Sequence, residues 1–201
     1  MLPNEAVNCE STSKPTSEST SESTKARLLN RLSSYWKMEL ANVLFLPAVA
    51  LVTVSALGGK ITGALLLSLF TTAWLLVIGM IALLMLLKEL ERDKKFSEFW
   101  LPKLRLAKLP SLVLVVVCMV VTVVDVISVA PAFTAAQYGA MLFSLLALLE
   151  YINYYHCQLQ HFDNQADFQR LISGRGFRQS HLARALERYE RLNQSHLPKR
   201  G

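Results

Sequence analysis

Four stretches of the chain are apolar, with almost no charge, over lengths that suit a membrane crossing. Residues 40–57 carry no charge over 18 residues, and residues 61–87 carry none over 27. Residues 109–130 hold a single acid, and residues 132–149 hold no charge. A helix rises about 1.5 Å per residue and a bilayer core is about 30 Å thick, so about 20 apolar residues can span it. The pattern therefore predicts four transmembrane helices.

Several features inside these stretches bear on how the helices cross and pack. Residues 61–87 extend about 40 Å as a helix, so this helix is expected to tilt or to project beyond the lipid. The many valines of residues 109–130 would suit a buried strand in a soluble protein, but the length favours a spanning helix. Pro47 is expected to kink the first helix. Ala136 and Ala140 form a small-residue face, where we expect close contact with another helix.

The segment before the first stretch has two parts of different composition. Residues 1–24 are rich in Ser, Thr and Glu and contain the near repeat SESTSEST, so we predict a disordered tail. Residues 25–38 place Leu, Tyr and Trp at helical spacing opposite Arg and Lys, which is typical of an amphipathic helix at a membrane surface. A membrane domain over residues 39–155 and a helical extension over residues 150–201 follow.

The segment between the second and third stretches is basic and aromatic. Residues 88–95 are expected to extend the second helix, and residues 96–108 mix aromatic, leucine and basic side chains. Pro102 and Pro110 are expected to limit any helix there. An amphipathic segment at the membrane surface is the first interpretation of residues 96–108, and a docking surface for a partner is the second.

The segment after the fourth stretch contains two predicted helices. Residues 150–171 continue the fourth stretch as one amphipathic helix, and a charged helix follows at residues 180–193, after two glycines. At about 100° per residue, one face of the first helix carries a polar stripe that is a candidate functional site. The stripe consists of Glu150, Asn153, Cys157 and His161.

Three polar residues near this stripe are weak candidates for metal ligands. His156, His161 and Asp163 offer imidazole and carboxylate groups, which suit zinc and other transition metals. One straight helix spreads them too far apart to close a site, and the sequence has no second His or Cys cluster to complete it. We therefore expect no metal and no other cofactor. Phosphate-binding and common hydrolase motifs are also absent from the sequence.

Asp125 is the single ionisable residue within the four predicted stretches. A carboxylate in lipid costs several kcal/mol unless it faces protein or water, so Asp125 is the candidate for intramembrane chemistry. It could accept a proton or a cation, with Gln137 or Thr72 as hydrogen-bond partners. The other interpretation is a structural hydrogen bond to a neighbouring helix.

The charge distribution predicts the orientation in the membrane. Apolar residues make up 52% of the chain and charged residues 18%, which excludes an ordinary soluble globule. Of the 21 Lys and Arg, only Lys60 lies in a connection expected on the outer side. The positive-inside rule therefore places both termini in the cytoplasm, across a bacterial inner membrane or an equivalent internal membrane. The net charge of +6 then indicates contact with anionic lipid headgroups and not with nucleic acid.

The three cysteines are consistent with a cytoplasmic setting. Cys9, Cys118 and Cys157 lie in three separate segments and form no paired framework, so we expect reduced thiols.

Together these patterns predict an all-α integral membrane protein. Its four transmembrane helices would form two hairpins, with amphipathic cytoplasmic helices before, between and after them. The expected function is that of a non-enzymatic subunit, scaffold or assembly factor that binds a protein partner or another copy of itself on the cytoplasmic side. A small oligomeric transporter or channel using Asp125 is the alternative. An enzyme working at the cytoplasmic membrane surface is a further alternative.

Overall fold

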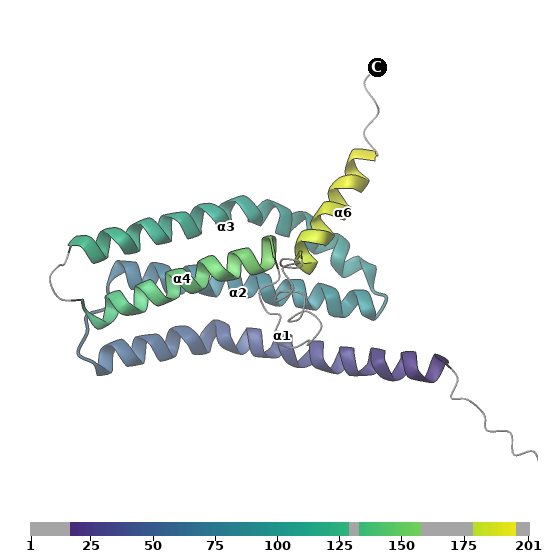
Figure 1. Cartoon of the computed structure of the whole chain (residues 1–201), viewed down its shortest axis with the longest axis horizontal. Helices are drawn as coiled ribbons and strands as arrows, with labels where there is room; N and C mark the ends of the chain where they lie inside the picture. Colours follow the sequence, from purple (N-terminus) through teal and green to yellow (C-terminus); the bar gives the residue numbers. More distant parts are fainter. Residues whose placement is uncertain (1–16, 129–132, 158–178, 196–201) are drawn as a thin grey trace, which may run out of the picture.

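A computed structural model of the chain describes residues 17–128, 133–157 and 179–195. Predictions that fall on residues 1–16, 129–132, 158–178 and 196–201 lie outside the described residues. The described part is all-helical, as predicted, and contains no strand beyond one isolated bridge. Its helices are α1 (Ser17–Ala56), α2 (Gly63–Leu90), α3 (Lys94–Ser128), α4 (Ala135–Tyr155) and α6 (His181–Ser195), shown in Figure 1.

Four of these helices are long and apolar enough to cross a membrane, which confirms the predicted number of spans. The segments that qualify are Leu29–Ala56, Gly63–Leu90, Lys95–Ser128 and Ala135–Tyr155. Their large apolar side chains are exposed in the absence of lipid: Val120 is 56% exposed and Ile127 is 71% exposed. In a bilayer these side chains face acyl chains, which are as apolar as they are.

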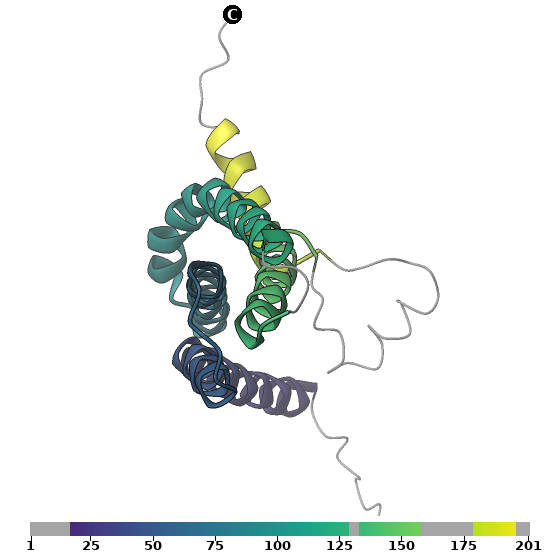
Figure 2. The ribbon, with the colours of Figure 1, turned by 90° about the vertical axis from the view of Figure 1, so that its left-hand side faces the viewer.

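The helix α2 occupies the centre of the bundle. It packs against α1, α3 and α4, whereas α1 and α3 do not touch each other (Figure 2). The face of α2 that meets its neighbours includes Leu65 and Leu75, both fully buried. The bundle is therefore organised around α2, with α1 packed on it from one side.

Small residues allow α4 to approach α1 and α2 closely. Ala136 and Ala140 are both fully buried within one apolar cluster, which confirms the predicted helix contact. A Cβ atom on Gly139 would lie 3.0 Å from Leu65 Cδ1 of α2. Removal of side-chain volume here lets the helix backbones come together, as in other membrane bundles.

The helix α1 is longer than predicted at its N-terminal end. The helix α1 begins at Ser17 and runs without interruption through residues 25–38. The predicted disordered tail and separate surface helix therefore differ from the structure over residues 17–38. Once a helix exists, each further residue gains a backbone hydrogen bond without a new nucleation cost, which favours such extension.

The connection between α2 and α3 also differs from the prediction. The helix α2 ends at Leu90 and not at residue 95, because Arg92 adopts a left-handed conformation with φ 67°. The helix α3 then begins at Lys94 and contains both Pro102 and Pro110. Each proline removes one backbone donor, a loss that the rest of this 35-residue helix outweighs. Figure 1 shows α3 changing direction between its two halves.

The predicted continuous helix over residues 150–171 is wrong. The helix α4 ends at Tyr155, and His156 has non-helical angles of φ −128° and ψ −79°. Cys157 then forms an antiparallel bridge with Gln179. The helix ends here because the segment before α6 binds its last carbonyls: the Ser180 amide donates to His156 O at 3.1 Å, and the Ser180 hydroxyl donates to Tyr154 O.

The helix α6 is fixed to the bundle by apolar contacts and by Ser180. This helix matches the predicted helix over residues 180–193, and its Leu182, Ala183 and Leu186 are buried against the bundle. The Ser180 hydroxyl also accepts a hydrogen bond from the Ala183 amide at 3.0 Å and so caps α6. One buried side chain thus joins the end of α4 to the start of α6.

Replacing Ser180 with alanine is expected to loosen α6 by about 1 kcal/mol, because a capping bond and a bond to the end of α4 are lost together. Hydrogen exchange measures this directly. Amides of α6 should exchange about fivefold faster in the variant, while amides of α2 keep their rate. Ser180→Thr retains the hydroxyl and serves as the control. Unchanged exchange in α6 would show that Ser180 does not anchor the helix.

Candidate functional site

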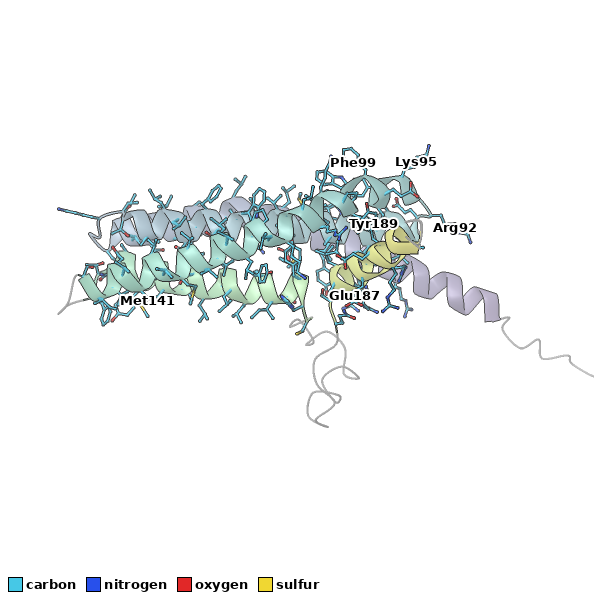
Figure 3. The ribbon with its side chains drawn as sticks, turned by 90° about the horizontal axis from the view of Figure 1, so that it is seen from above. Arg92, Lys95, Phe99, Met141, Glu187 and Tyr189 are labelled. Carbon is cyan, nitrogen blue, oxygen red and sulfur yellow. The ribbon has the colours of Figure 1, made fainter. Side chains whose placement is uncertain are left out.

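Among the described residues, polar side chains lie at both ends of the bundle. We call the end where α6 packs the α6 end, and the end where α1 connects to α2 the turn end. Figure 3 shows Arg92, Lys95 and Phe99 at the α6 end, together with Glu187 of α6. Each end also has a cavity, and the cavities differ in their lining.

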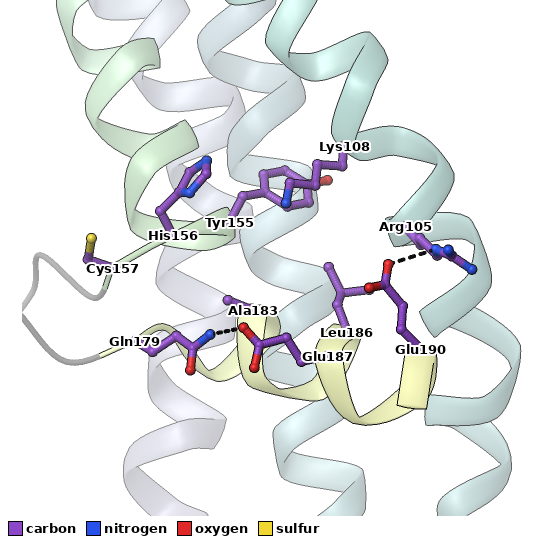
Figure 4. A pocket seen from close by; sticks show the side chains of 10 residues that line it. All are labelled: Arg105, Lys108, Tyr155, His156, Cys157, Gln179, Ala183, Leu186, Glu187 and Glu190. Carbon is purple, nitrogen blue, oxygen red and sulfur yellow. Dashed lines mark hydrogen bonds and ion pairs between the residues drawn. The ribbon is translucent and has the colours of Figure 1, made fainter. Parts of the chain in front are cut away.

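The cavity at the α6 end has a volume of about 420 Å³ and lies between α3, α4 and α6. Figure 4 shows that α3 and the end of α4 form one wall and α6 forms the other. Tyr155 forms part of this lining; its ring is 2% exposed and its hydroxyl donates to Leu104 O at 3.2 Å. The lining residues are Arg105, Lys108, Tyr155, His156, Cys157, Gln179, Ala183, Leu186, Glu187 and Glu190.

Charges of both signs line this cavity, and most of them are paired. The Arg105 Nε lies 3.0 Å from Glu190 Oε1, and Gln179 donates a hydrogen bond to Glu187 (Figure 4). Lys108 is exposed and takes part in no ion pair within the described residues. The cavity therefore presents one available cation beside acids that are already engaged.

A basic and aromatic surface lies on the same half of α3. The Lys103 Nζ sits 3.2 Å from the centre of the Phe99 ring and 4.9 Å from that of Trp100. Phe99 is 58% exposed, so the pair faces outward. The residues predicted as a surface segment, 96–108, thus form part of a continuous helix that displays aromatic and basic side chains together.

Sequence reasoning missed an interaction between α1 and α4 in the interior. The Tyr154 hydroxyl donates to Glu39 Oε1 at 3.4 Å, across 115 positions of the chain. Tyr154 is 8% exposed, and its ring lies against Gly79 of α2. Glu150, one turn before Tyr154, has a buried Oε2 without a hydrogen-bond partner in the structure. The available signal was Glu39 itself, an acid directly beside an uncharged stretch.

The sequence therefore understated the number of acids in spanning helices. Asp125 was the single acid predicted inside a span, whereas Glu39 and Glu150 also lie within helices that could cross a membrane. The reason is that α1 and α4 both extend past the ends of their uncharged stretches.

Asp125 lies at the turn end and lines a cavity of about 510 Å³. Its Oδ2 atom is buried and has no hydrogen-bond partner in the structure. Neither of the predicted partners binds the carboxylate. Gln137 Nε2 donates to the Asp125 main-chain carbonyl at 2.9 Å, and the Thr72 hydroxyl donates to carbonyls of Ser68 and Phe143.

An apolar layer separates the two ends inside the bundle. Leu75, Val115 and Ala147 come from three different helices and are at most 1% exposed. All three belong to one buried cluster. Each lies about 18 to 20 Å along its helix from the turn end, at about 1.5 Å per residue. The two cavities are therefore separated by side-chain packing in this conformation.

The polar stripe predicted after the fourth stretch is divided by the end of α4. Glu150 and Asn153 lie in α4, and Cys157 lies beyond its end in the bridge to Gln179. His161 and the metal candidate Asp163 are outside the described residues. His156 lines the α6-end cavity, and no group of three or more His, Cys, Asp or Glu in the described ranges is arranged to hold a metal ion.

These features define a helical multi-pass membrane protein with a cavity at each end of a four-helix bundle. The α6-end cavity lies under a helix fixed to the bundle, and Asp125, the predicted intramembrane candidate, lines the turn-end cavity. No protein family, curated protein or solved structure matches this chain. The functional argument therefore rests on the residues themselves.

Proposed function

We propose that the protein is a non-enzymatic membrane interaction protein, a subunit, scaffold or assembly factor, whose partner docks at the α6 end. The observation that carries this proposal is the position of α6. Its apolar face is buried on the bundle, and between α6, α3 and α4 lies a cavity of about 420 Å³ whose lining includes the available Lys108. A helix that is already packed beside a charged cavity need not become ordered when a partner docks, so binding costs less conformational entropy.

The proposal includes an orientation. We place α1 with α2 and α3 with α4 as two hairpins, with amphipathic helical segments and both termini in the cytoplasm. Twenty of the 21 basic residues then lie on the cytoplasmic side, with Lys60 alone on the other. The α6 end therefore faces the cytoplasm. The exposed pair of Lys103 and Phe99 would meet anionic headgroups at the membrane surface.

The state of the ionisable groups favours docking over catalysis. At the α6-end cavity, Arg105 is paired with Glu190, and Glu187 accepts from Gln179. The Arg105–Glu190 pair joins α3 to α6, and Lys108 is left to meet an incoming acid. Complementary charge at an interface chiefly sets specificity and association rate, which suits a partner surface.

Reversing the charge of Lys108 is expected to weaken partner docking by about tenfold, since a desolvated charge pair across an interface contributes strongly to binding. A photo-crosslinking amino acid placed at Glu187, which is exposed and lines the cavity, should give a discrete adduct in intact membranes. The adduct yield should fall about tenfold in Lys108→Glu. Mass spectrometry then identifies the attached chain, whether another protein or a second copy.

Lys95→Glu is the matched control. Lys95 is also an exposed lysine near the start of α3 at the same end, but it does not line the cavity. Its reversal should leave the adduct unchanged. A crosslinker at Met141, which lies on the outer surface of α4 and is 45% exposed, should capture no partner of this kind. Absence of an adduct at Glu187, or equal loss in both lysine variants, would contradict the proposal.

A small oligomeric transporter or channel is the second candidate function. The observation that favours it is the buried, unpartnered Oδ2 of Asp125 beside a cavity. Passage would require the layer of Leu75, Val115 and Ala147 to open. Flux into liposomes that contain the protein, abolished by Asp125→Asn, would identify such a transporter.

A further inference from the structure

The turn-end cavity combines an acid and a base that do not pair with each other. Asp125 of α3 and Lys60 of the connection between α1 and α2 both line the cavity of about 510 Å³. No ion pair within the described residues joins them. Because the acid and the base do not pair with each other, the acid can bind a positive group of a ligand and the base can bind a negative group.

One carboxylate oxygen of Asp125 receives no hydrogen bond from the described residues. The Asp125 Oδ2 is buried from solvent and has no partner, although its own main-chain carbonyl is bound by Gln137. Asp125 also lines the cavity and forms no ion pair within the described residues, so its carboxylate can receive a ligand that supplies N–H groups. A primary ammonium supplies three such donors and the compensating charge.

The lining of the cavity also carries positive charge, for two reasons. Lys60 contributes its ammonium group, and two long helices begin there. Thr62 caps the start of α2 and Thr134 caps the start of α4, and both residues line the cavity. The first backbone amides of a helix carry partial positive charge, so two helix starts beside a lysine favour an anion.

We infer that this cavity binds a primary-amine zwitterion of the phosphoethanolamine type, with its ammonium on Asp125 and its phosphate toward Lys60. Two sources carry this chemistry, the headgroup of phosphatidylethanolamine and free phosphoethanolamine. The cavity also includes Leu57, which is 70% exposed at the end of the bundle, so a lipid headgroup can enter from the membrane surface. The inference rests on this cavity and does not depend on partner docking at the α6 end.

The test uses the full chain in nanodiscs of phosphatidylcholine and phosphatidylglycerol. Calorimetry with free phosphoethanolamine examines the soluble source. Mass spectrometry of lipids retained after detergent exchange, from nanodiscs that also contain phosphatidylethanolamine, examines the lipid source. Binding in either arm supports the inference and identifies the source. Phosphocholine, which has no N–H donor, should bind at least tenfold more weakly than phosphoethanolamine.

Two variants separate the two charges of the ligand. Asp125→Asn keeps the shape of the side chain and should weaken binding about tenfold or more. Lys60 is exposed in the connection between α1 and α2. Lys60→Gln should weaken the binding of phosphoethanolamine but not that of ethanolamine, which has no phosphate. Lys95→Gln at the other end of the bundle is the control for net charge. No binding in either arm, equal binding of phosphocholine, or binding insensitive to Asp125→Asn would overturn the inference.

Discussion

Replacing Gly79 with alanine is expected to destabilise the bundle by about 2 to 3 kcal/mol, because an added methyl group overpacks the core and displaces a bonded side chain. A Cβ atom at this position would overlap the ring of Tyr154. The ring cannot yield freely, because it is 8% exposed and its hydroxyl holds Glu39 of α1. The midpoint of unfolding in a denaturing detergent measures the loss.

A second glycine of α2 provides the control for the Gly79 experiment. A Cβ atom on Gly63 would meet nothing within 4 Å, so Gly63→Ala should change stability by less than about 0.5 kcal/mol. If overlap with the ring is the cause, Gly79→Ala should add little cost in a Tyr154→Leu background. An equal loss in that background would refute the steric explanation.

Replacing Gln137 with leucine is expected to lower the free energy of unfolding by about 2 kcal/mol. Each hydrogen bond lost within a membrane bundle accounts for about 0.6 kcal/mol or more. Gln137 is 1% exposed and makes bonds in two directions. Its Oε1 accepts from the Thr134 amide and hydroxyl, and its Nε2 donates to the Asp125 carbonyl of α3. Leucine fills the space but leaves these groups without partners.

Gln137→Leu should also change hydrogen exchange near the substituted residue. Exchange of amides at the start of α4 should accelerate, because the half of the capping box in which the Gln137 side chain accepts from the Thr134 amide is lost. Ser128→Ala is the control: among the described residues, its exposed hydroxyl bonds only the Val124 carbonyl of its own helix. That variant should change stability by less than about 0.5 kcal/mol. Equal effects of the two changes would show that Gln137 is not the link between α3 and α4.

The spans could be predicted because lipid imposes a simple requirement of length and apolarity. Four apolar stretches gave four helices, and the small residues Ala136 and Ala140 correctly indicated a contact. The ends of helices at the α6 end could not be predicted in this way. The end of α4 at Tyr155 depends on Ser180, which is 25 positions later and reaches it only after folding.

The candidate site was predicted less completely than the fold. Asp125 stood out because a charge in an apolar stretch is costly, but its cavity depends on Lys60 and on two helix starts from other segments. The α6-end cavity combines three segments, and Lys108 resembles any other basic residue beside a span until α6 packs next to it. Tertiary packing, which a single sequence does not display, creates both cavities.

The central place of α2 constrains how the protein is made. Chains enter the membrane from the N-terminus during synthesis, so α1 and α2 are inserted before the helices that cover the rest of α2. Until α4 arrives, Thr72 lacks its bond to the Phe143 carbonyl of α4 and keeps only its bond to the Ser68 carbonyl of its own helix. Insertion of α4 therefore completes the core, and a fragment released before α4 is made would leave the α4-contacting face of α2 uncovered in the bilayer.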